Sequence, residues 1–236
     1  MLRMLAGVWV ALTMAAGASA QISGGLSTSA PLSGASCSEP ALGGKFTIAY
    51  PAKPISITWR GESFAFDRTV WMNDSREHSR TVFDAYVAAL GADLKVNLGV
   101  GAMTDMRAVS GGVLVATNAG EWGGGLVFVT PVGKAAQVIG DNTHALIDLG
   151  GSLYALTGLS HLGLDHGVVW RIDVSGAAPV ARELAKLPGS PVAWAIAEDR
   201  AILIATGRND VAVLPDGTIE PAKSERVCTG LKGLRE

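Results

Sequence analysis

Two histidines and an aspartate stand close together in the segment "SHLGLDHG", residues 160–167. His161, Asp165 and His166 offer two imidazoles and a carboxylate, which are ligand types that zinc accepts, and His144 stands in a neighbouring polar segment. A divalent metal held by these four residues could support a metal-assisted hydrolase or a lactonase. No H-E-x-x-H helix, paired cysteines or D-x-D-x-D-G run accompanies them, so a polar loop between two strands explains the same residues.

Other catalytic patterns have less support in this sequence. Ser160 stands next to His161, but neighbouring residues of a strand point to opposite faces, and "GLSHLG" is not the G-x-S-x-G motif of serine hydrolases. The segments "GVGAMT" and "GEWGGG" lack the spacing and context of phosphate-binding or dinucleotide-binding loops, so their glycines are better explained by turns. Acid-base catalysis by the acidic loop residues depends on burial, which leaves that alternative open.

The segments around these residues have the pattern of an all-β domain. From Lys45 onward, short apolar runs rich in Val, Ile, Leu and aromatic residues are separated by Gly, Asp, Asn and Pro turns about every ten residues. We therefore expect residues 45–236 to form the folded domain. Residues 21–44 are expected to be a flexible leader, because residues 21–36 are small and polar and have little to bury.

The first twenty residues have the pattern of a secretory signal peptide. Arg3 precedes an apolar run over residues 4–16, and Ala18 and Ala20 form an A-x-A-like cleavage site. We expect a soluble, exported mature protein, periplasmic or secreted, with no membrane insertion. A retained signal anchor is the alternative.

The net charge bears on the classes of binding partner, and the cysteine content bears on the redox state of the compartment in which the protein folds. Removing the signal changes the formal net charge from −2 to −3, and no basic patch indicates nucleic acid or an anionic membrane as a partner. Cys37 and Cys228 lie near opposite ends of the mature chain. In an oxidising compartment we expect them to form one disulfide, with two free thiols as the alternative. A crosslink over so long a loop could stabilise the fold by up to roughly 5 kcal/mol.

An internal repeat predicts the fold more specifically. Segments with the same order of apolar runs and turns begin at four positions: Thr81, Leu126, Val168 and Val211. In two of them "VLVATN" aligns with "ILIATG". Equivalent points at Val82, Val127, Val169 and Val211 are 45, 42 and 42 residues apart. Each copy holds about four strands, which is the period and content of a β-propeller blade.

We therefore predict a small all-β propeller of about four blades, with five thin blades or an irregular sandwich as alternatives. The last copy is truncated, and residues 46–72 can supply its missing strands. Pairing of the N- and C-terminal strands would then close the ring, and the expected disulfide would lock it. Val82 also begins a stripe of apolar residues with helical spacing over 82–90, but its alignment with the "VVWRIDV" segment favours a strand there.

The repeat over residues 81–222 resembles generic β-propeller repeats of the broadly NHL-like type, most clearly where "LYALTG" is followed by "GVVWRIDVSG". The resemblance implies a fold and carries no catalytic residue onto this chain, because propellers of unrelated function share these features. Four tryptophans fall in strands and are expected to pack between blades: Trp59, Trp71, Trp170 and Trp194.

In such a propeller, loops between second and third strands emerge on the same side as the connections between blades. This arrangement places every histidine of the chain on one face, which we expect to bind a ligand. The residues of this predicted ligand-binding face are Arg76, Glu77, His78, Glu121, Trp122, His144, His161, Asp165, His166 and Arg208. Trp122 stands beside three glycines and is the candidate anchor, unless it packs back over a blade edge.

Three hypotheses for function follow. The first is an exported propeller that binds a protein or a small-molecule ligand through this face, without catalysis or a cofactor. The second is an enzyme, a metal-assisted hydrolase or lactonase that uses His144, His161, Asp165 and His166 as ligands of a divalent metal. The third is an incomplete propeller that a partner chain completes.

Overall fold

The computed structural model describes residues 36–40, 47–51, 53–69, 81–82, 84 and 102–227. The predicted signal, most of the predicted leader, and Cys228 lie outside the described residues. One segment of the predicted leader, Ser36–Pro40, forms strand β1 and pairs with β2 (Thr47–Pro51). No helix within the described ranges is long and apolar enough to span a membrane.

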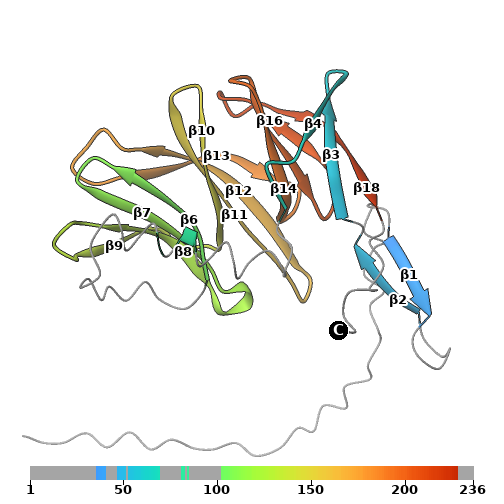
Figure 1. The fold of residues 1–236 in the computed structure, drawn as a ribbon, viewed down its shortest axis with the longest axis horizontal. Coiled ribbons are helices and arrows are strands. Elements are labelled where there is room, and N and C mark those ends of the chain that lie inside the picture. Colours follow the sequence, from blue (N-terminus) through green and yellow to red (C-terminus); the bar gives the residue numbers. More distant parts are fainter. Residues whose placement is uncertain are drawn as a thin grey trace, which may run out of the picture. The chain divides into compact units, whose positions relative to one another are not determined.

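The described chain consists almost entirely of antiparallel strands, which confirms the all-β prediction (Figure 1). Beside the β1–β2 pair there are four larger sheets. The first sheet contains β6 (Ala102–Val109), β7 (Gly112–Asn118), β8 (Gly124–Val129) and β9 (Ala135–Ile139). The second sheet contains β10 (Thr143–Leu149), β11 (Ser152–His161), β12 (Leu164–Asp173) and β13 (Val180–Leu187). The third sheet contains β5 (Arg68–Thr69), β14 (Pro191–Ala197), β15 (Ala201–Thr206), β16 (Val211–Val213) and β17 (Ile219–Pro221). The terminal sheet contains β18 (Lys223–Val227), β3 (Lys53–Trp59) and β4 (Glu62–Ala65).

The 42-residue spacing of the repeat corresponds to equivalent strands. Val127, Val169 and Val211 lie in β8, β12 and β16, each of which is the third strand of four that follow one another in a sheet. The second strands of the three sheets also share one feature. Each carries a buried threonine whose hydroxyl donates to a nearby backbone carbonyl, and these residues are Thr117, Thr157 and Thr206. The sequence repeat therefore predicted three equivalent structural units correctly.

The predicted strand at Val82 is wrong. Thr81, Val82 and Asp84 are helical, and Val82 is buried. A stripe of apolar residues with helical spacing allows a helix to bury one face, and here this preference outweighs the similarity to the "VVWRIDV" segment. The remaining positions of the stripe lie outside the described residues.

The two ends of the described domain meet in the terminal sheet. Strand β18 pairs antiparallel with β3, so that Lys223 lies opposite Thr58. Residues 46–72 were expected to complete the copy that begins at Val211. Strands β16 and β17 pair within the third sheet, which β5 also joins at its edge beside β14, whereas β3 and β4 belong to the terminal sheet. Short connections favour the pairing of consecutive strands. The described sheets do not form a closed ring.

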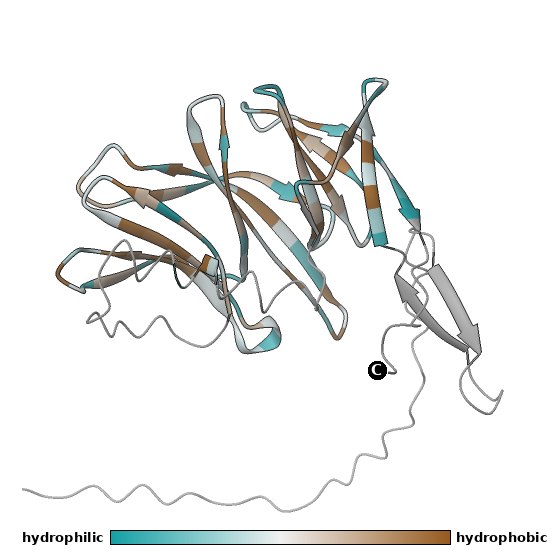
Figure 2. Cartoon of the chain, viewed as in Figure 1, coloured by the Kyte–Doolittle hydropathy of each residue, from teal (hydrophilic) through white to brown (hydrophobic). Residues whose placement is uncertain are grey.

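Apolar side chains fill the space between successive sheets, and Figure 2 shows hydrophobic residues concentrated along the strands. One cluster joins the first and second sheets, another joins the second and third, and another joins the third and terminal sheets. Each of these clusters includes a tryptophan, in the order Trp170, Trp194 and Trp59. Their predicted packing between sheets is confirmed, whereas Trp71 lies outside the described residues.

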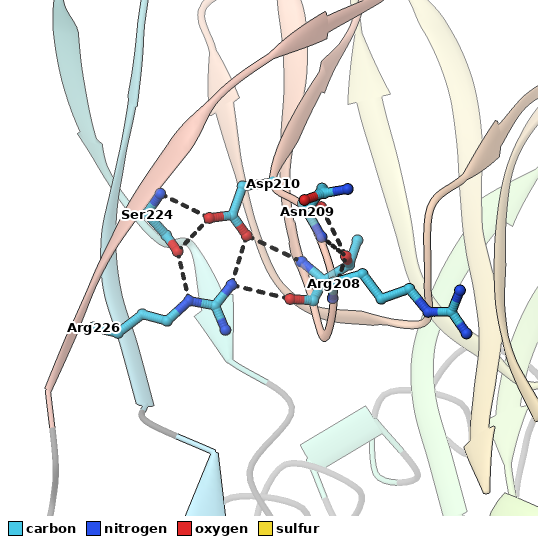
Figure 3. Close-up of polar contacts among 6 residues, drawn as sticks. Arg208, Asn209, Asp210, Ser224 and Arg226 are labelled. Carbon is cyan, nitrogen blue, oxygen red and sulfur yellow. Dashed lines mark hydrogen bonds and ion pairs between the residues drawn. The ribbon is translucent and has the colours of Figure 1, made fainter. Parts of the chain in front are cut away.

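A nearly buried ion pair joins β18 to the third sheet (Figure 3). The Arg226 Nη2 atom donates to Asp210 Oδ1 at 2.6 Å, and the two side chains are only 11 % and 12 % exposed. Asp210 Oδ2 also accepts from the Ser224 amide at 2.9 Å and from the Ser224 hydroxyl at 2.6 Å. Arg226 donates in addition to the Thr206 carbonyl. These additional hydrogen bonds offset the desolvation of both charges.

Replacing Arg226 by methionine tests this connection. The change leaves the Asp210 carboxylate nearly buried without its counter-charge, so we expect the free energy of unfolding to fall by about 3 kcal/mol or more. Urea denaturation measures the loss. Lys186→Met is the matched control, because it also removes one positive charge from an ion pair, but from an exposed one. The Lys186 Nζ atom lies 3.9 Å from Glu183 Oε1, and both side chains are exposed. Equal losses in the two variants would contradict the special role of Arg226.

Candidate functional site

The loops at one end of the first three sheets contact one another. We call this region the polar rim and define it as residues 118–124, 140–144, 158–167, 188–190 and 206–210. The connections between a second and a third strand are 118–124, 158–167 and 206–210. The connections between successive sheets are 140–144 and 188–190. Figure 1 shows the β7–β8 connection and the β11–β12 hairpin extending from the same end of their sheets. Hydrogen bonds and ion pairs between segments hold the rim together.

Asn142 fixes the loop that carries Trp122. This loop contains the short 3-10 helix η1 (Gly120–Trp122). Asn142 is 2 % exposed, and its Oδ1 accepts from the Ala119 amide at 3.1 Å while its Nδ2 donates to the Gly120 carbonyl at 2.7 Å. The connection between the first and second sheets therefore sets the conformation of the η1 loop.

His144 is a structural residue beneath the same loop. It is buried, with its Nε2 2.9 Å from the Gly158 carbonyl and its Nδ1 3.3 Å from the Asn118 side-chain nitrogen. A carbonyl only accepts and an amide nitrogen only donates, so these contacts assign a neutral ring protonated at Nε2. Both ring nitrogens are occupied within the fold, which leaves neither for a metal.

The other two described histidines each contact an acid from a neighbouring loop. His161 Nε2 lies 2.5 Å from Glu121 Oε2, although without the orientation of a hydrogen bond. His166 Nε2 lies 3.1 Å from Asp141 Oδ2. When either histidine is protonated, its contact becomes an ion pair across the rim. Each pair connects a strand of the second sheet to a segment nearer the start of the chain.

Asp165 connects the second sheet to the third. Its side chain is 10 % exposed, its Oδ1 accepts from the Ser190 amide at 2.7 Å, and its Oδ2 accepts from Arg208 Nε at 2.8 Å. The backbone approaches closely here, because a Cβ on Gly189 would lie only 2.9 Å from the carboxylate. This packing explains a glycine at that position.

The same arrangement recurs one sheet later, and sequence reasoning missed it. Asp210 accepts from the Ser224 amide and from Arg226, as Asp165 accepts from the Ser190 amide and from Arg208. Asp165 and Arg208 were predicted for the rim, but their serine partner and the whole Arg226 network were not. The two sites share a sequence signal. An aspartate lies close to the start of the third strand, as Asp165 does in β12 and Asp210 does before β16. A serine follows later in the chain, at Ser190 and Ser224.

The four residues predicted as metal ligands do not converge on one point. His144, His161, Asp165 and His166 each have separate protein partners. Within the described ranges, no group of three or more His, Cys, Asp or Glu side chains could hold a metal ion. Asp165 and His166 follow each other in β12, where successive side chains point to opposite faces.

Three large apolar side chains project from the rim into solvent. Trp122 is 76 % exposed, Leu162 is 90 % exposed and Leu164 is 61 % exposed. The alternative that Trp122 packs over a sheet edge is therefore wrong. Three other residues of the predicted face, Arg76, Glu77 and His78, lie outside the described residues.

The chain was compared with protein-family models, with curated proteins and with solved structures. None of the three comparisons found a match. The resemblance to NHL-like repeats stays a prediction.

Replacing Asn142 by alanine tests the support of the η1 loop. The change removes both hydrogen bonds to residues 119–120, so we expect faster amide hydrogen exchange at 119–123 and a loss of about 1–3 kcal/mol in unfolding free energy. Gln137→Ala is the control, because Gln137 is an exposed amide residue in the preceding strand β9. Unchanged exchange at 119–123 in Asn142→Ala would show that other contacts hold the loop.

Proposed function

We propose that this chain is an exported, propeller-like protein that binds a protein partner through the polar rim and does no chemistry itself. The observation that carries the proposal is a set of exposed apolar residues on the rim: Trp122, in the loop that Asn142 holds, and Leu162 and Leu164, in the β11–β12 hairpin. Large apolar and aromatic side chains of this kind act as anchors in protein interfaces. The export part of the proposal is supported by the signal-like pattern of residues 1–20.

The conformation of Leu162 supports a contact role. Leu162 and Gly163 form the two-residue turn between β11 and β12, with φ angles of 45° and 88°. Positive φ at both positions favours asparagine or glycine over leucine. Arg60 and Glu198, the other described non-glycine residues with positive φ, have charged partners. Leu162 is exposed instead, so neither its backbone nor packing within the chain explains a leucine there.

The rigidity of the rim supports the same conclusion. Asn142 holds the loop of Trp122, and the contact between His161 and Glu121 connects that loop to the end of β11. Residues held in place before binding lose less conformational entropy when they bind. The rim therefore presents its apolar residues at a lower entropic cost than free loops would.

The propeller part of the proposal rests on the order of the sheets. Three successive sets of four consecutive strands, β6–β9, β10–β13 and β14–β17, follow the 42-residue repeat, and β18 pairs with β3 near the two ends of the domain. Loops between second and third strands also contact the connections between sheets, as they do between propeller blades. A disulfide between Cys37 and Cys228 is part of the same proposal.

A metal-assisted hydrolase or lactonase is the weaker alternative. Its four candidate ligands each have separate partners within the fold, so binding a metal would require the rim to rearrange. Stoichiometric metal in the purified protein, lost on replacing His161 and His166 by alanine, would favour this alternative.

A photo-crosslinking amino acid placed at Trp122 or at Val132 tests the binding face. Both positions are 76 % exposed, and Val132 lies beyond the other end of β8, away from the rim. In the exporting host we expect a discrete crosslinked adduct from position 122 and none from position 132, detected by gel shift and mass spectrometry. Adducts of equal yield from both positions, or from position 132 alone, would contradict the proposed face.

Replacing Leu162 by asparagine separates binding from stability. Asparagine adopts positive φ at lower cost than leucine, so we expect the free energy of unfolding to rise by about 0.5–1 kcal/mol. The yield of the adduct from position 122 should fall at least severalfold because an apolar anchor is lost. Val132→Asn should change neither quantity. An unchanged adduct yield in Leu162→Asn would remove Leu162 from the proposed interface.

A further inference from the structure

An open pocket of about 450 Å³ lies at the end of the second sheet opposite the polar rim. It is formed where β11 begins, where β12 ends and where β13 begins. Its lining includes Leu153 and Ile172, which are nearly buried and belong to the core cluster between the first and second sheets. Its polar lining is Ser152, Arg171, Asp173, Ser175 and Arg182. The pocket is therefore separate from the residues on which the proposed binding function rests.

Two arginines lie side by side in the lining of this pocket, on the same face of the second sheet. Arg171 in β12 and Arg182 in β13 are direct partners in the antiparallel register, which places their Cα atoms about 5 Å apart. Like charges directly opposite each other on neighbouring strands destabilise a sheet. Arg171 uses one donor on the Ser152 hydroxyl at 3.0 Å, and Arg182 has no hydrogen bond or ion pair among the described residues. Most of the guanidinium N–H donors therefore remain available to a ligand.

The acid in the pocket is turned toward its own loop. Asp173 Oδ1 accepts from the Ser175 hydroxyl at 2.6 Å and from the Ser175 amide at 3.0 Å. These hydrogen bonds, and more weakly the two nearby arginines, lower the pKa of Asp173, so the carboxylate is ionised at neutral pH. It forms no ion pair with either arginine within the described ranges, and the three charged side chains leave a net charge of +1 in the pocket.

We infer that this pocket binds a small organic anion, with a carboxylate or phosphate group held between the guanidinium groups of Arg171 and Arg182. Guanidinium groups bind planar carboxylates and phosphates through paired charge-assisted hydrogen bonds. A bound anion would also relieve the repulsion between the two arginines.

Titration of the full chain with sodium phosphate and with sodium butyrate tests the site. At constant, low ionic strength we expect saturable shifts of the arginine side-chain NMR signals with at least one of the two anions, and the responding anion identifies the bound group. Arg171→Gln or Arg182→Gln should weaken binding about tenfold by removing a charge-assisted hydrogen bond. Lys186→Gln removes the same charge from the same strand outside the pocket and should leave the affinity unchanged.

Asp173→Asn distinguishes a ligand site from internal charge balance. If the anion lies between the arginines, removing the neighbouring carboxylate charge should tighten binding severalfold. If the arginines serve only to balance Asp173, neither anion will give saturable shifts in the unaltered chain or in Asp173→Asn, and the inference is overturned. Equal weakening of anion binding by Lys186→Gln and Arg182→Gln would also overturn the inference. Such a result would show that binding depends on the overall charge of the protein and not on a site in the pocket.

Discussion

The central strands of the first three sheets are buried on both faces, and this constraint shapes the rest of the molecule. All six residues of β15 are buried, as are residues 113–117 of β7 and 153–158 of β11. Such strands need a neighbouring sheet on each side, so their sequences are nearly continuous apolar runs instead of alternating patterns. Stacking of the sheets through tryptophan-containing clusters follows from this requirement. Polar chemistry is then confined to the ends of the strands.

Polar groups at those ends must be hydrogen-bonded where the sheets crowd together. The chain meets this need in a similar way at three places. Asn142 and Asp165 each accept a backbone N–H from an adjoining connection, at Ala119 and Ser190, and Asp210 accepts one from Ser224 in strand β18. Two of the three also bind an arginine. Loops between strands thereby become part of the scaffold, and this is why the rim can present exposed apolar residues in a defined arrangement.

The two ends of the second sheet have different chemistry. At the hairpin end, Leu162 and Leu164 are exposed beside His161, which contacts Glu121 of the neighbouring loop. At the opposite end, Arg171 and Arg182 lie side by side on neighbouring strands, and Asp173 balances one of their two charges. An antiparallel sheet places its turns alternately at two ends, so a single repeat unit can carry exposed apolar residues at one end and a pair of arginines at the other.

The sequence by itself determined the strand content, the 42-residue unit and the equivalence of Val127, Val169 and Val211, because burial, turns and strand period leave a local pattern in the order of residues. It also indicated which loops share one side, since that depends only on strand order. It misassigned Val82, where a stripe of apolar residues fits a helix and a strand alike. The sequence also predicted that strands near the two ends of the chain pair, and the tertiary structure identified these strands as β18 and β3. The internal position of His144 and the separate partners of Asp165 and His166 emerged from the tertiary structure alone. These outcomes depend on contacts between residues distant in the chain, and spacing along a sequence does not encode the direction or the partner of a side chain.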